Sequence, residues 1–78
     1  MILEDVLMVA AKNRTEPVCA SFGPLETGFK PAFAALIAAY NISGEIEAAW
    51  LSEPMFGSPE AAIEHGEDLI NPNNIYEW

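Results

Sequence analysis

The sequence predicts an α+β fold in a single small domain that spans residues 1–78. Three observations support this class. The chain has room for only one domain, and it is 51% hydrophobic against 19% charged, which indicates that it folds. One stretch alternates apolar and polar residues as a strand does, and two others have the spacing or the start signals of a helix. We expect a short N-terminal β-hairpin and one further strand, together with two helices at about residues 28–41 and 58–70.

The first 22 residues contain two short apolar runs, at residues 6–11 and 17–22, with a polar segment between them. Two such runs around a polar connection favour a β-hairpin. The spacing of Leu3, Val6, Leu7 and Ala10, preceded by Ile2, also fits a first helix. Both forms therefore stay open for residues 1–22.

In the segment at residues 28–41, large apolar residues recur at i, i+4, i+7, i+8 and i+11. They are Phe29, Phe33, Leu36, Ile37 and Tyr40. This spacing is typical of one face of a helix. The opposite face holds alanines, and a helix that is apolar on all sides is normally covered on all sides. A homodimer that pairs the face of Ala32, Ala35 and Ala39 with its own copy would supply that cover.

Residues 45–51 and 58–70 give the clearest local signals. The alternating residues of the first stretch are Ile46, Ala48 and Trp50 on one side and Glu45, Glu47 and Ala49 on the other. This period of two predicts a strand. In the second stretch, Ser58 can cap a helix, Pro59 fits the first helical position, and Glu60 lies near the positive end of the helix dipole.

The charge of the chain is strongly acidic and unevenly distributed. Twelve acids against three bases give a formal net charge of −9. All three bases lie in residues 1–40, so the C-terminal half, residues 41–78, has no lysine or arginine. Direct binding to nucleic acid or to an anionic membrane needs a basic surface, so this composition argues against both.

A helix over residues 58–70 would gather four carboxylates on one side. These are Glu60, Glu64, Glu67 and Asp68, and the opposite side would hold Ala62, Ile63, Gly66, Leu69 and Ile70. Carboxylates four residues apart stand ~6 Å apart along the axis, a spacing broadly like that of charges along a nucleic-acid backbone. The alternative to a binding role is a solvent-exposed helix face that only makes the domain soluble. Gly66 could also end the helix at His65 and divide the row.

The sequence offers little for catalysis, so we expect no enzyme. Cys19 is the only cysteine and His65 the only histidine. A small buried hydrophobe is the commoner role of such a cysteine, and His65 with Asp68 falls short of the three or four ligands of a metal site. We therefore expect no catalytic residues, no metal and no cofactor. No disulfide framework, no basic signal region and no apolar run of ~18 residues is present, which favours a cytoplasmic location in a bacterium or an infected host.

In size, acidity and lack of catalytic groups, the chain resembles the small acidic proteins that bacteriophages make against host nucleic-acid machinery, among them anti-CRISPR inhibitors and DNA mimics. The resemblance depends on the acids of the C-terminal half. It implies a non-enzymatic inhibitor that binds the basic nucleic-acid-binding surface of a protein partner, such as a nuclease. The partner-binding residues would be Glu45, Glu47, Glu53, Glu60, Glu64, Glu67 and Asp68, with the aromatic residues Tyr76 and Trp78. The alternative function is a structural subunit that oligomerises through the alanine-rich helix.

Overall fold

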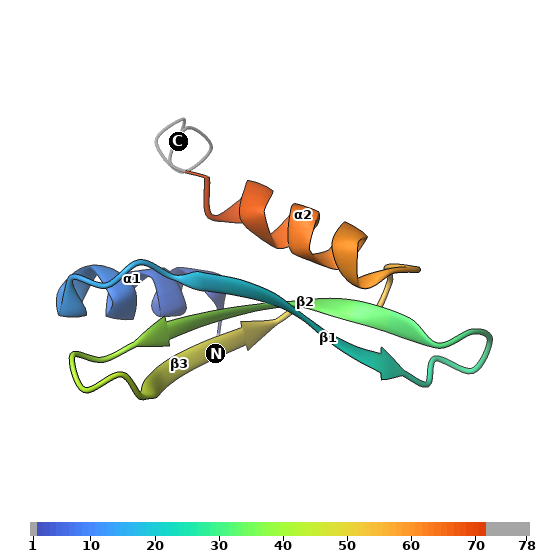
Figure 1. The fold of residues 1–78 in the computed structure, drawn as a ribbon, viewed down its shortest axis with the longest axis horizontal. Coiled ribbons are helices and arrows are strands. Elements are labelled where there is room, and N and C mark those ends of the chain that lie inside the picture. Colours follow the sequence, from blue (N-terminus) through green and yellow to red (C-terminus); the bar gives the residue numbers. More distant parts are fainter. Residues whose placement is uncertain (1, 72–78) are drawn as a thin grey trace.

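The computed structural model describes residues 2–71 and has an α+β fold, which confirms the predicted class. Two helices and three strands follow in the order α1, β1, β2, β3 and α2 (Figure 1). Their bounds are α1 Leu3–Asn13, β1 Val18–Leu25, β2 Ala32–Tyr40, β3 Ile46–Leu51 and α2 Pro59–Leu69. Neither helix of this part of the chain has the length and hydrophobicity needed to cross a membrane.

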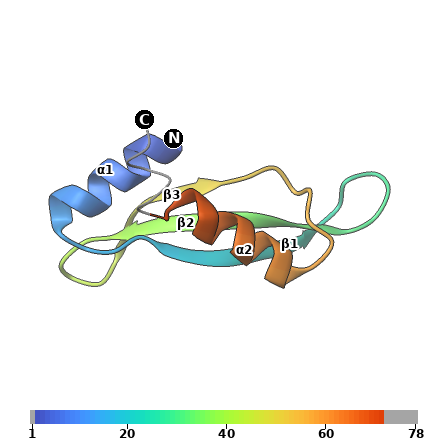
Figure 2. The ribbon, with the colours of Figure 1, turned by 90° about the horizontal axis from the view of Figure 1, so that it is seen from above.

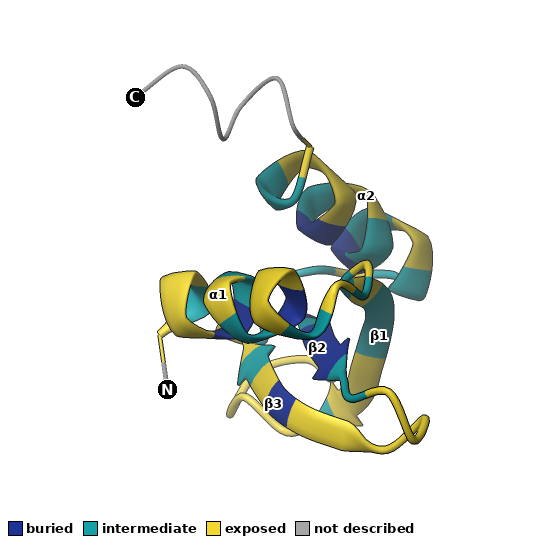
Figure 3. Ribbon diagram, turned by 90° about the vertical axis from the view of Figure 1, so that its left-hand side faces the viewer, coloured by how far each residue is buried: buried dark blue, intermediate teal, exposed yellow. Residues whose placement is uncertain are grey.

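The three strands form one antiparallel sheet in the order β1-β2-β3, with β2 in the centre. Both helices lie over the same face of this sheet (Figures 1 and 3). Helix α1 packs on β2 and β3, and helix α2 packs on β1 and β2, so that the two helices share the face between them (Figure 2). The result is a two-layer arrangement of helices on a sheet.

The helix predicted at residues 28–41 is wrong, because these residues form the central strand β2. In a strand, successive side chains point to opposite faces. Phe33 and Ile37 therefore lie on the side of the helices, whereas Leu36 and Tyr40 lie on the other side. A long apolar run fits both a buried strand and a buried helix, and the helical spacing of its large side chains favoured the helix.

The predicted dimer face of Ala32, Ala35 and Ala39 is wrong for the same reason. Ala35 and Ala39 are fully buried beneath the helices. Ala32 points to the opposite side of the sheet, since its position differs from theirs by an odd number of residues. These three alanines therefore share no surface that could pair with a copy.

The N-terminal β-hairpin is also wrong, and the alternative first helix is confirmed for the first apolar run. Helix α1 buries Val6 and Ala10, which are four residues apart, and ends at Arg14 in the left-handed conformation (φ 57°). The second apolar run becomes β1. Thr15 Oγ1 donates a hydrogen bond to the carbonyl oxygen of Tyr40 at 2.8 Å, which ties the end of α1 to the end of β2.

The strand at residues 45–51 and the helix at residues 58–70 are confirmed as β3 and α2. Ser58 caps α2 as expected, because its Oγ accepts a hydrogen bond from the backbone N–H of Ala61 at 3.2 Å. Pro59 is the first residue of the helix. The helix continues through Gly66 to Leu69, so Gly66 does not end it.

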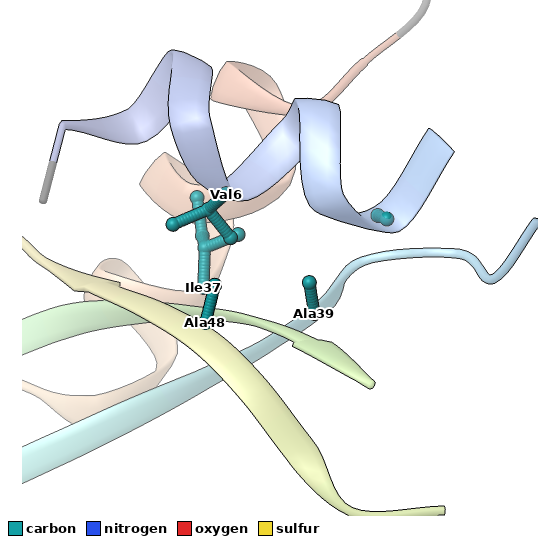
Figure 4. Close-up of a cluster of buried hydrophobic side chains, with 5 residues drawn as sticks. Val6, Ile37, Ala39 and Ala48 are labelled. Carbon is teal, nitrogen blue, oxygen red and sulfur yellow. The ribbon is translucent and has the colours of Figure 1, made fainter. Parts of the chain in front are cut away.

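The hydrophobic core between the layers is small. Its buried cluster consists of Val6 and Ala10 from α1, Ile37 and Ala39 from β2, and Ala48 from β3 (Figure 4). Among the described residues, nine hydrophobic side chains are buried, and seven of them are alanines. The layers thus approach closely, but the domain buries few large side chains.

The other face of the sheet carries no helix, and we call it the open face (Figures 1 and 3). Strand register and alternation identify its residues, because directly paired residues of an antiparallel sheet point to the same side. They are Val18, Ala20 and Phe22 in β1, Ala32, Ala34, Leu36, Ala38 and Tyr40 in β2, and Ala49 and Leu51 in β3, with Ile46 joined to them by the register shift that pairs it with Tyr40. None of these residues is charged, but Glu47 alternates with Ala49 and lies at the β3 edge of the same face, where its carboxylate accepts a hydrogen bond from Asn13 Nδ2.

Candidate functional site

The outer side of α2 carries the four carboxylates predicted from the sequence, which we call the acidic face. Glu60, Glu64, Glu67 and Asp68 are all exposed. Ala62 and Gly66, on the opposite side of the helix, are buried against the sheet. The helix is continuous between Pro59 and Leu69, so the carboxylates form one row, with ~6 Å of axial rise between members four residues apart.

Contacts on the inner side of α2 fix the direction in which the acidic face points. Gly66 lies against Cys19 of β1 and Ala35 of β2, and a Cβ at position 66 would collide with Cys19 Sγ. The Cys19 thiol donates a hydrogen bond to the carbonyl oxygen of Ile63 at 3.4 Å. The rings of Phe56 and His65 lie 4.9 Å apart between centroids. Helix α2 therefore has a defined rotation about its axis, which turns the carboxylates outward.

The row of carboxylates is unfavourable for the helix that carries it. Glu60 lies in the first turn, where the helix dipole favours a negative charge. Glu67 and Asp68 lie near the C-terminal end, where the helix dipole disfavours a negative charge. The last turn contains no basic residue. Like charges four residues apart also repel each other. The sequence thus places negative charge here at a local cost in stability.

Glu16 extends this negative surface onto the segment before β1. Glu16 and Glu67 line the same surface pocket, together with Pro17, Ile70 and Asn71. Glu16 is not among the acids predicted from the sequence, because it lies in the half of the chain that contains the bases. Only the packing of α2 on β1 brings it beside the acidic face.

The other predicted acids are exposed, but they lie apart from α2. Glu45 and Glu47 are at the end of the sheet near the last turn of α1, where Asn13 Nδ2 donates a hydrogen bond to Glu47 Oε1 at 3.1 Å. Glu53 follows the opposite end of β3. Strand β3 is covered by α1, whereas α2 packs on β1 and β2. The structure therefore brings together four of the seven predicted acids, and the predicted aromatic contacts Tyr76 and Trp78 lie outside the described residues.

Cys19 and His65 make packing contacts within the domain. The Cys19 thiol is engaged with Ile63, and the His65 ring lies against Phe56. Burial raises the pKa of the Cys19 thiol above its ordinary value of 9.0, and the negative charge of Glu67 raises it further. Between residues 2 and 71, no group of three histidine, cysteine or acidic side chains is placed to hold a metal ion.

The raised pKa of Cys19 gives the stability of the domain a dependence on alkaline pH. The folded state holds the thiol proton more tightly than the unfolded state, whose thiol titrates near 9.0. This contribution is therefore complete below that pH and is lost as the pH rises through the folded pKa. We expect the free energy of unfolding, measured by urea denaturation, to fall more steeply above pH ~9 for the wild type than for Cys19→Ala. Equal slopes for the two proteins would contradict this assignment.

No protein-family model, no curated protein and no solved structure matches this chain.

Proposed function

We propose that this protein is a small acidic inhibitor without enzymatic activity, which binds a basic nucleic-acid-binding surface of a protein partner. The acidic face of α2, extended by Glu16, would occupy the place of the nucleic acid, as in a DNA mimic. The partner class is a nuclease or another nucleic-acid-binding complex. An anti-CRISPR or related phage anti-defence role in the cytoplasm of a bacterium or an infected host fits this chemistry.

The observation that carries the proposal is the outward row of four carboxylates on a helix whose inner side is fixed to the sheet. This row lies in a half of the chain with no lysine or arginine. A fixed row of negative charge attracts a cationic groove over a long range and speeds the encounter with it. A cationic surface that covers the row would reduce the repulsion between its carboxylates.

The test compares two variants with the same net charge. Glu60, Glu64 and Glu67 are changed together to Gln in one variant, and Glu26, Glu45 and Glu53 in the other. Each variant moves the formal net charge from −9 to −6, but only the first alters the acidic face. Tagged wild-type protein is used in low salt to capture basic proteins from a bacterial lysate, and the captured proteins are purified and titrated with each variant.

We expect the acidic-face variant to lose affinity about tenfold or more, because several charged contacts disappear together, while the control variant stays close to the wild type. The wild type should also displace DNA or RNA from the captured protein, and rising salt should weaken the complex steeply. An equal loss of affinity in both variants would show that binding depends on the net charge of the protein and not on the acidic face. Binding that persists in molar salt would exclude an electrostatic mimic.

A further inference from the structure

We propose that the open face of the sheet is the interface of a homodimer, in which two copies of the chain pack their sheets against each other. This inference does not depend on the proposed function, because it concerns the side of the molecule opposite to α2. Two observations point to it. The face is mostly apolar, with Glu47 at its β3 edge held by Asn13, and the core between helices and sheet buries mainly alanines, so that larger apolar side chains stay on the open face.

The open face exposes large apolar side chains on both of its edge strands. Val18 and Phe22 of β1 are 45% and 47% exposed, and Ile46 and Leu51 of β3 are 57% and 44% exposed. Between them, Ala34 and Ala38 of β2 are buried, so the exposed apolar area lies mainly along the two edge strands. Apolar patches of several hundred Å² are the largest that soluble monomers usually expose, and they are often functional.

The area of the open face is sufficient for a weak but specific dimer. Phe22 and three aliphatic side chains are about half exposed, and with their smaller neighbours they present at most roughly 500 Å² per chain. Two such faces together would remove at most roughly 1,000 Å² from water, which is the size of a weak or transient protein interface. A dissociation constant in the micromolar range is the expectation for such an area.

A second copy fits the open face better than a partner of another chemistry. A strongly charged partner would find only Glu47, at the β3 edge, to pair with. Between the helices and the sheet, the domain buries mainly alanines and keeps larger side chains on the open face, so each copy can supply the apolar layer that the other lacks. Interfaces of obligate homodimers likewise resemble a hydrophobic core divided between two chains.

The charge of −9 does not oppose this arrangement. In a face-to-face dimer, two sheets and two helix layers lie between the acidic faces, and packed layers are ~10 Å apart. The two rows of carboxylates are then separated by several times the screening length of ~8 Å at physiological salt. Each acidic face stays exposed on the outside of the dimer.

Sedimentation equilibrium at several protein concentrations, with the full chain, tests the proposal. The wild type should be dimeric at high micromolar concentration and dissociate on dilution. Ala49→Lys places a charge on the open face at an exposed position and should weaken the dimer at least tenfold. Met8→Lys is the control, since Met8 is 68% exposed on α1 and the substitution gives the same change in net charge.

Circular dichroism of both variants confirms that they are folded before the comparison. A Met8→Lys protein that dimerises like the wild type, together with a monomeric Ala49→Lys protein, supports the proposal. A wild type that stays monomeric at high micromolar concentration overturns it. So does an Ala49→Lys protein that dimerises with the affinity of the wild type, because the interface would then lie elsewhere.

Discussion

Replacement of Ile37 by alanine is expected to lower the free energy of unfolding by about 2–4 kcal/mol. Within residues 2–71, Ile37 and Val6 are the largest side chains that are fully buried, and Ile37 lies in the core cluster beside Val6. Its truncation leaves a cavity that the surrounding alanines are too small to fill. Domains of this size have a total stability of roughly 4–12 kcal/mol, so the variant should be substantially unfolded at moderate urea concentrations.

The neighbouring residue Leu36 provides the control. It points to the open face and is only half-buried, so Leu36→Ala should cost about 1 kcal/mol at protein concentrations where the chain is monomeric. Urea denaturation followed by circular dichroism measures both variants under the same conditions. Equal losses at positions 36 and 37 would contradict the strand, because in a helix these two residues would share one apolar side.

This contrast explains why the sequence predicts a helix where the structure has strand β2. The spacing of Phe33, Leu36, Ile37 and Tyr40 matches a helix. The run contains no polar residue to indicate that alternate side chains lie on opposite faces of a sheet. The central strand of a sheet is apolar on both faces, and its pattern then lacks the alternation by which strands are recognised. Strand β3 could be predicted because its exposed edge retains Glu45 and Glu47 among the apolar residues.

The acidic face could be predicted because it depends on one helix only. Ser58 and Pro59 locate the start of α2, and the period of 3.6 residues then places its carboxylates on one side. Residues from other elements could not be assigned in this way. The position of Glu16 beside Glu67, and the separation of Glu45 from both, follow from the packing of α2 on β1 and of α1 on β3.

The second large effect is expected at Gly66, where the packing of α2 is closest. Gly66→Ala should destabilise the domain by about 1–3 kcal/mol, because the added Cβ collides with Cys19 Sγ. To relieve the collision, the thiol must leave the carbonyl oxygen of Ile63, or α2 must move away from β1. Either change loosens the helix that carries the acidic face. In an isolated helix the same substitution is favourable by about 1 kcal/mol. The expected destabilisation therefore comes from the packing of α2 against the sheet.

A double-mutant cycle with Cys19→Ala separates the collision from other effects of the substitution. Without the sulfur atom, the added Cβ meets only Cβ atoms at ordinary contact distances, 3.7 Å at position 19 and 3.5 Å at Ala35. Gly66→Ala should therefore be neutral or stabilising in the Cys19→Ala background, although it is destabilising in the wild type. Urea denaturation of the four proteins gives the coupling between the two positions, which we expect to be about 2–3 kcal/mol. Equal losses in both backgrounds would mean that the contact of Gly66 with Cys19 does not set the distance between α2 and the sheet.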